Sequence, residues 1–234
     1  AYTLPRLEPG VHHVKILIDN GNSAVPAGVH GSHAWTDATQ TNWNGVIGRF
    51  AIDAKPMTHI ADLQLYPDVE MSDVVVKLKV FSSIKTLCDI TLRRSTFCDE
   101  SDDECVVTSK QTLSVGENDV EMRIDMGENP NLWSEFHPDL YTVTATLKTK
   151  DESDEMTGQF GMRSFKTEGT QFVINGFKTF LRGTHDGCVF PLTGYAPADV
   201  DEWRRLFTIA KEYGINHYRF HSYTPTEAAF QAAD

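Results

Sequence analysis

The 234-residue sequence lacks several features that would point to particular classes of protein. It has no apolar run near the ~18 residues that span a bilayer. Its first residues lack the basic start and apolar centre of a signal peptide. Positive charge is scarce, and the formal net charge of -12 disfavours binding to nucleic acid or to an anionic membrane. We therefore expect no nucleic-acid partner and no membrane insertion.

Close pairs of cysteine residues are also missing. None of the four cysteines belongs to a CxxC pair, which argues against a structural zinc site. Cys98 and Cys105 flank an acidic turn and could form a disulfide across a hairpin, although unpaired thiols are favoured. The acidic residues 99–104 lack the glycine and spacing of a calcium loop, which favours a solvated hairpin tip. The sequence also has no phosphate-binding glycine loop and no HExxH motif. We expect no metal and no cofactor.

What the sequence does contain is repeated alternation of apolar and polar residues through residues 56–167. The segments lie at residues 59–67, 74–82, 89–97, 105–113, 119–125 and 140–149. Turn-forming residues separate them. Six or seven short strands over roughly 100 residues are typical of an immunoglobulin-like β-sandwich.

The preceding residues 1–55 predict only a few strands, at 12–18 and 46–52. So few strands make a poor independent core. We interpret this region as the tail of a larger β domain. The cluster of Ser, His and Asp at residues 32–37 is too local for a hydrolase triad, which is assembled in space from separate elements.

The pattern changes after Thr167. Asn175 and Gly176 form a strong turn dipeptide and predict a hairpin over residues 171–181. Asp199, with Glu202 three residues later, predicts the start of a helix that ends at Gly214.

A buried strand is expected at residues 215–220, followed by a second helix with Thr224 as its cap and Pro225 at its first position. Strand, helix, strand and helix in succession indicate the start of a β/α domain. The sequence ends inside the second predicted helix, so we expect it to be a truncated part of a longer protein.

Motifs along the chain resemble those of glycoside hydrolase family 2. TNWNGVIGR at residues 41–49 resembles a signature near the end of the family's N-terminal jelly-roll domain. LWSEFHPDLY at 132–141 and FGMR at 160–163 are similar to segments of its sandwich domain. FVING at 172–176 with FLRG at 180–183, and YGINHYRFH at 213–221, look like the first segments of its barrel.

The resemblance implies a mainly β fold with three parts. Residues 1–55 would be the C-terminal part of a jelly-roll sugar-binding domain, and residues 56–167 the immunoglobulin-like sandwich. Residues 168–234 would be the first part of a (β/α)8 TIM barrel, truncated because a whole barrel needs ~250 residues.

The function implied by the resemblance is that of a retaining β-glycosidase acting on O-glycosidic bonds in oligo- or polysaccharides. Retention needs two carboxyl groups about 5 Å apart. In the family both are glutamates on later barrel strands, which we expect beyond Asp234. We therefore assign no catalytic residue and expect the chain alone to be inactive. The alternative is a non-catalytic carbohydrate-binding β-sandwich module.

Four residues at the ends of the predicted barrel strands are candidate substrate-binding residues by this resemblance. They are His185, Asp186, Arg219 and His221. Arg219 could instead pair with a barrel carboxylate, and His221 could be a core histidine. Residues 184–190 depart from the His/Glu arrangement of β-galactosidases and β-glucuronidases, so the sugar and the linkage remain open.

Trp43 and Asn44 are further candidates for contact with sugar. In the family their loop can lean toward the mouth of the barrel, and a tryptophan stacks well on a pyranose ring. The alternative, slightly favoured, is that Trp43 fills the gap between the jelly roll and the barrel. The expected partner is carbohydrate, the oligomeric state is open, and a periplasmic or secreted location is expected for the full-length enzyme.

Overall fold

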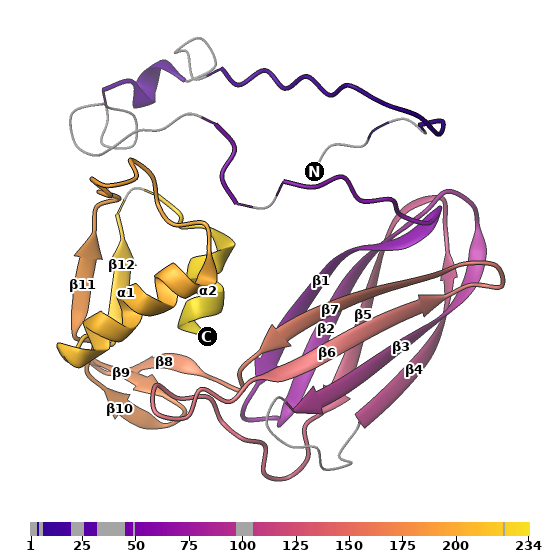
Figure 1. Cartoon of the computed structure of the whole chain (residues 1–234). Helices are drawn as coiled ribbons and strands as arrows, with labels where there is room; N and C mark the ends of the chain where they lie inside the picture. The colour runs from indigo at the N-terminus through magenta and orange to yellow at the C-terminus, as the bar shows by residue number, and fades with distance from the viewer. Residues whose placement is uncertain are drawn as a thin grey trace.

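The computed structural model describes residues 4, 7–19, 26–31, 45–48, 50–96, 105–221 and 223–234. The fold is mainly β, as predicted. Most of the secondary structure lies in two parts, which we call the two-sheet unit (residues 58–163) and the strand–helix unit (residues 183–234). A small three-stranded sheet connects them (Figure 1).

The described residues before the two-sheet unit contain one short 3-10 helix, η2 (Ala27–Val29), and no strand. Residues 12–18 and the described part of 46–52 were predicted as strands, but they form no ladder with any described strand. Their apolar side chains, such as Val14, Ile16 and Phe50, are exposed. Alternation of apolar and polar residues does not by itself make a β-strand, because a β-strand must form hydrogen bonds with a neighbouring strand. These two strand predictions are wrong for the described residues, and the assignment to a jelly roll stays a prediction.

The two-sheet unit contains seven antiparallel strands. One sheet has the order β1 (Thr58–Asp68), β2 (Asp73–Ser82), β5 (Gly116–Asp125). The other has the order β4 (Cys105–Leu113), β3 (Thr86–Thr96), β6 (Tyr141–Lys148), β7 (Ser153–Phe160). The six segments predicted from alternation are β1 to β6, and β7 is the seventh strand.

The inward-facing side chains of both sheets form one apolar core. Its fully buried members include Ile60, Val76, Leu78, Ile90, Leu92 and Leu147. Burial alternates residue by residue along β2, β3 and β6, as expected when one face of each strand points to the core.

The connecting sheet has the order β10 (Phe177–Thr179), β9 (Gln171–Ile174), β8 (Phe165–Glu168). Asn175 and Gly176 join β9 to β10 with φ of 48° and 80°. Positive φ at both residues is what a two-residue type I′ hairpin requires, so the predicted Asn-Gly turn is confirmed.

The strand–helix unit consists of β11 (Gly183–Asp186), α1 (Val200–Glu212), β12 (His217–Phe220) and α2 (Glu227–Ala233). β11 and β12 are parallel. The Asp199 side chain accepts a hydrogen bond from the Glu202 backbone N–H at 2.8 Å, and Gly214 follows the helix with φ of 77°. Both predicted ends of α1 are therefore confirmed. The indole of Trp203 is fully buried between α1, β12 and α2.

The predicted start of the second helix is wrong. The N-cap is Thr226 rather than Thr224, and the helix begins at Glu227. The Thr226 hydroxyl donates to the Pro197 carbonyl at 2.8 Å, and the indole Nε1 of Trp203 donates to the same carbonyl at 2.9 Å. Tertiary contacts with the loop before α1 thus override the local capping pattern.

Candidate functional site

The parallel pair β11–β12 brings three of the predicted site residues together. His185 lies in register with Arg219, and both side chains are exposed. The opposite face of the pair packs on α1, since the Tyr218 ring lies 4.8 Å from Phe207 and the Phe220 ring lies 5.8 Å from Trp203, between centroids. His185 and Arg219 therefore lie on the face that is turned away from the helix.

The imidazole rings of His185 and His221 form a pair at the carboxyl ends of the strands. Their centroids are 4.6 Å apart and their planes make an angle of 45°. The backbone N–H of His221 donates to the Asp186 carbonyl at 2.8 Å, which extends the strand pairing by one residue. Neighbouring imidazole and guanidinium groups can donate hydrogen bonds, and a neutral imidazole can also accept one. Such a set suits the hydroxyl groups of a sugar.

Asp186 differs from His185, Arg219 and His221 because it lies on the opposite face of the strand pair from His185. It is half-buried, as is His221. Its carboxylate oxygen Oδ1 accepts a hydrogen bond from the backbone N–H of Cys188 at 2.8 Å. Cys188 is buried and has a φ of 60°, in the left-handed region. Burial, followed by the charge of Asp186, raises the pKa of the Cys188 thiol to about 11.

Tyr223 was not predicted from the sequence, although it lies two residues after His221. Its hydroxyl is buried close to the Asp186 carboxylate. Burial raises the pKa of this hydroxyl, and the nearby Asp186 carboxylate raises it further. The only sequence signal for Cys188 and Tyr223 was their closeness to the strand ends.

Comparison with known proteins identifies the family. The family model "Glycosyl hydrolases family 2" matches residues 58–163. Over these residues the chain matches glycoside hydrolase family 2. It is similar to a beta-galactosidase of Thermoanaerobacter pseudethanolicus, with 28% identity over 71% of this chain and 22% of the relative.

Solved structures of family 2 proteins share the fold. The beta-glucuronidase of Parabacteroides merdae is 25% identical, with a TM-score of 0.56 over 76% of this chain and 22% of its own. A family 2 member from Bacteroides cellulosilyticus has a TM-score of 0.65 over 75% of this chain and 25% of its own, at 21% identity. This chain therefore spans about a quarter or less of the length of these relatives.

The remaining predicted residues fall outside the site described above. Trp43 and Asn44 lie outside the described residues, as do the cluster at 32–37, Cys98 and the acidic residues 99–104. Cys105 carries a free thiol. Where the structure describes the chain, no three His, Cys, Asp or Glu side chains gather as a metal site, and no helix is long and apolar enough to cross a membrane.

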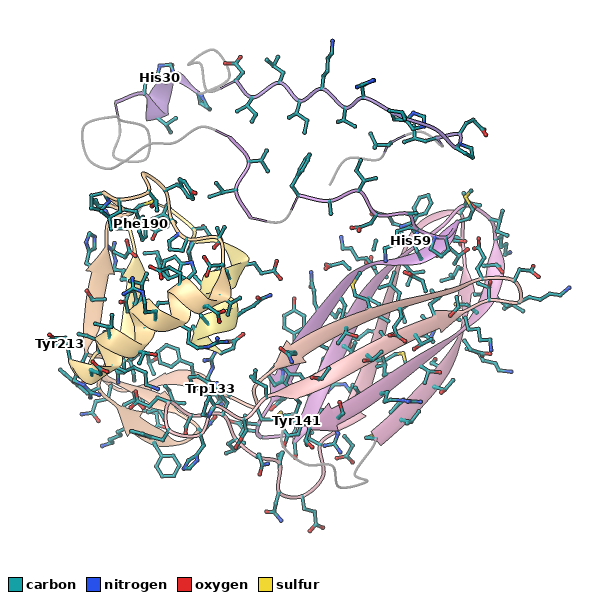
Figure 2. All side chains as sticks on the ribbon, viewed as in Figure 1. His30, His59, Trp133, Tyr141, Phe190 and Tyr213 are labelled. Atoms are coloured by element: carbon teal, nitrogen blue, oxygen red, sulfur yellow. The ribbon has the colours of Figure 1, made fainter. Side chains whose placement is uncertain are left out.

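Figure 2 shows the side chains that surround the ends of β11 and β12. Phe190 lies beyond the carboxyl ends of β11 and β12, in the loop that leads toward α1. Its ring lies 6.1 Å from that of Trp203, edge to face. The loop after β11 is thereby anchored on the small apolar core around Trp203.

Proposed function

We propose that this chain supplies the scaffold and the first two barrel strands of a retaining β-glycosidase. One observation carries the proposal. The parallel pair β11–β12 bears the imidazoles of His185 and His221 and the Arg219 guanidinium at its carboxyl end, with Arg219 and His185 on the face away from α1. In a (β/α)8 barrel the helices cover the outside and the active site lies at the carboxyl ends of the strands. The side chains are where a sugar would bind.

The same proposal assigns the rest of the chain. The two-sheet unit corresponds to the immunoglobulin-like sandwich, and residues 1–55 to the C-terminal part of a jelly-roll sugar-binding domain. Residues 168–234 then form the first part of the barrel. In this assignment the connecting sheet β8–β10 joins the sandwich to the barrel.

The proposed role of His185, His221 and Arg219 is to bind and orient the sugar. Donors held on rigid strands orient a substrate at little entropic cost when it binds. Double displacement at the anomeric carbon also needs two carboxyl groups about 5 Å apart. We propose that these carboxyl groups belong to a part of the enzyme outside this chain, so that the chain by itself does not hydrolyse glycosides.

The substrate class proposed is an oligo- or polysaccharide with a terminal β-linked hexose or hexuronic acid. The names of the relatives, beta-galactosidase and beta-glucuronidase, support this range. Donors such as Arg219 can bind either a hydroxyl or a carboxylate group.

The test uses nitrophenyl β-galactoside and β-glucuronide with two proteins, the complete gene product that contains this sequence and residues 1–234 alone. We expect turnover by the complete product and none by residues 1–234. In the complete product His221→Ala should lower kcat/KM by about 10²-fold, because the sugar loses an orienting contact. His137→Ala is the control, since His137 lies on an exposed loop of the two-sheet unit.

Two results would contradict this function. Hydrolysis by residues 1–234 would show that no outside carboxylates are needed. Inactivity of the complete product, together with tight saturable sugar binding by residues 1–234 in calorimetry, would favour the non-catalytic binding module.

A further inference from the structure

The four site residues at the strand ends do not share one orientation. His185 and Asp186 are adjacent in β11, so their side chains point to opposite faces of the parallel pair. Asp186 lies in register with Phe220, whose ring contacts the buried Trp203. The Asp186 carboxylate is therefore on the helix side, behind the surface that His185 and Arg219 present.

The carboxylate of Asp186 holds the loop that follows β11. Its Oδ1 accepts the hydrogen bond from the backbone N–H of Cys188 at 2.8 Å. Cys188 has a φ of 60° and is only 1% exposed. A non-glycine residue in the left-handed region costs about 1 kcal/mol or more, so the surrounding structure must hold it there. The bond from Asp186 is one contact that does so.

The main chain of Asp186 holds the end of the neighbouring strand. Its carbonyl accepts the hydrogen bond from the His221 N–H at 2.8 Å. His185 directly precedes Asp186 in the chain, and His221 is hydrogen-bonded to the main chain of Asp186. Asp186 therefore links the two imidazoles, whose centroids are 4.6 Å apart.

The effect of the Asp186 charge on neighbouring pKa values agrees with its position on the helix side. Burial is the first cause of the raised pKa of Cys188, Tyr218 and Tyr223, and in each case the charge of Asp186 is the next cause. All three groups lie on or near the helix side of the strands. The charge of Asp186 thus acts on groups on the helix side of the strands.

We infer that Asp186 is a positioning residue of the sugar site and not a sugar ligand. It holds the loop after β11 and the end of β12, and through them it keeps His185 and His221 together on the opposite face. The inference rests on the proposed glycosidase function for its role in catalysis, but the positioning itself can be measured without activity.

The first measurement follows the thiol of Cys188 in the complete gene product. A buried thiol reacts with iodoacetamide only after the loop opens, and peptide mass spectrometry reports the rate at this one cysteine. We expect Asp186→Ala to raise the rate about tenfold, the effect of losing one hydrogen bond. Asp186→Asn should stay within about threefold of the unsubstituted protein, because its Oδ1 can accept the same bond. Asp201→Asn, on the exposed start of α1, is the matched control.

The second measurement separates kcat from KM. We expect Asp186→Asn to keep both within about threefold, and Asp186→Ala to lower kcat by about tenfold with little change in KM. A sugar-binding carboxylate would behave differently, since Asp186→Asn itself would raise KM by about tenfold or more.

The inference is overturned if Asp186→Ala leaves the Cys188 rate unchanged. It is also overturned if Asp186→Asn raises KM while Cys188 stays protected. Should the complete product show no glycosidase activity, the proposed function fails, and the Cys188 rates in Asp186→Ala and Asp186→Asn still decide whether Asp186 holds the loop.

Discussion

Gly161 has no room for a side chain because the indole of Trp133 lies against its backbone. A Cβ at this position would lie 2.7 Å from the Cβ of Trp133. The Trp133 ring is fixed from two further directions, since the Arg163 guanidinium lies 4.5 Å from the ring centroid and Nε1 donates to the Asp234 carbonyl at 3.0 Å. Figure 2 places Trp133 at the junction between the two-sheet unit and the strand–helix unit.

At this residue scale we predict that Gly161→Ala lowers the free energy of unfolding by about 1–3 kcal/mol, because the added methyl group overpacks the junction. Urea denaturation followed by circular dichroism measures the change. Gly28→Ala is the control, since a Cβ there meets no atom within 4 Å. Equal stability of the two variants would show that the Trp133 ring moves aside at no cost.

For the candidate site residues, the sequence indicated that they lie at the ends of the strands, but not which face of the strands each side chain occupies. The strand-end motifs placed His185, Arg219 and His221 near one another, and the structure brings them together. The same motifs grouped Asp186 with them, although its carboxylate lies behind the surface. The distinction depends on which face α1 covers, and no local pattern contains that information.

At the scale of elements, the turn between β9 and β10 joins the connecting sheet to the two-sheet unit. The Asn175 side chain accepts a hydrogen bond from the Ser164 N–H at 2.8 Å and donates one to the Trp133 carbonyl at 2.9 Å. Its backbone N–H donates to the Ser164 carbonyl at 3.0 Å. A residue that the sequence marked only as a turn former is therefore also a tertiary contact.

We predict that Asn175→Ala destabilises this hairpin by about 2–4 kcal/mol, since it loses two side-chain hydrogen bonds and strains a φ of 48°. Asn175→Asp should cost about 1 kcal/mol, because it keeps the acceptor for Ser164 and loses only the donor to Trp133. Amide hydrogen exchange over residues 171–179 measures both, with the exposed Lys178→Ala as control. If both variants exchanged at the same rate, the bond to Ser164 would carry none of the stability.

At the scale of the whole molecule, the two apolar cores differ in the groups whose pKa burial raises. The core of the strand–helix unit contains or borders Cys188, Tyr218 and Tyr223, and burial raises the pKa of all three. The core of the two-sheet unit contains Cys88, and burial also raises the pKa of its thiol. Such groups lose their protons more readily in the unfolded chain, so stability present below pH 9 falls as the pH rises.

We therefore predict that the strand–helix unit unfolds first as the pH rises from 9.0 toward about 11, the pKa range set by Cys188. Limited proteolysis with subtilisin at pH 8 and at about pH 10.5, with cleavage sites located by mass spectrometry, measures this. Cleavage within residues 183–234 should accelerate more than cleavage within 58–163, and Cys188→Ser should reduce the difference. Earlier cleavage of the two-sheet unit at high pH would contradict the prediction.

Local physical chemistry determines much of the secondary structure of this protein without tertiary contacts. Period-two alternation predicted β1 to β6, Asn175 and Gly176 predicted the hairpin, and Asp199 and Gly214 predicted the ends of α1, because each signal acts within a few residues.

Tertiary structure alone decided the features that depend on contacts between distant segments. The expected strand at residues 12–18 found no partner among the described residues, and Thr226 rather than Thr224 became the cap of α2. The orientation of Asp186 toward the side of α1 likewise follows from the packing of α1 against one face of β11–β12. Pairing, packing and facing direction are long-range properties, and they decide which side chains of the candidate site lie on its open face.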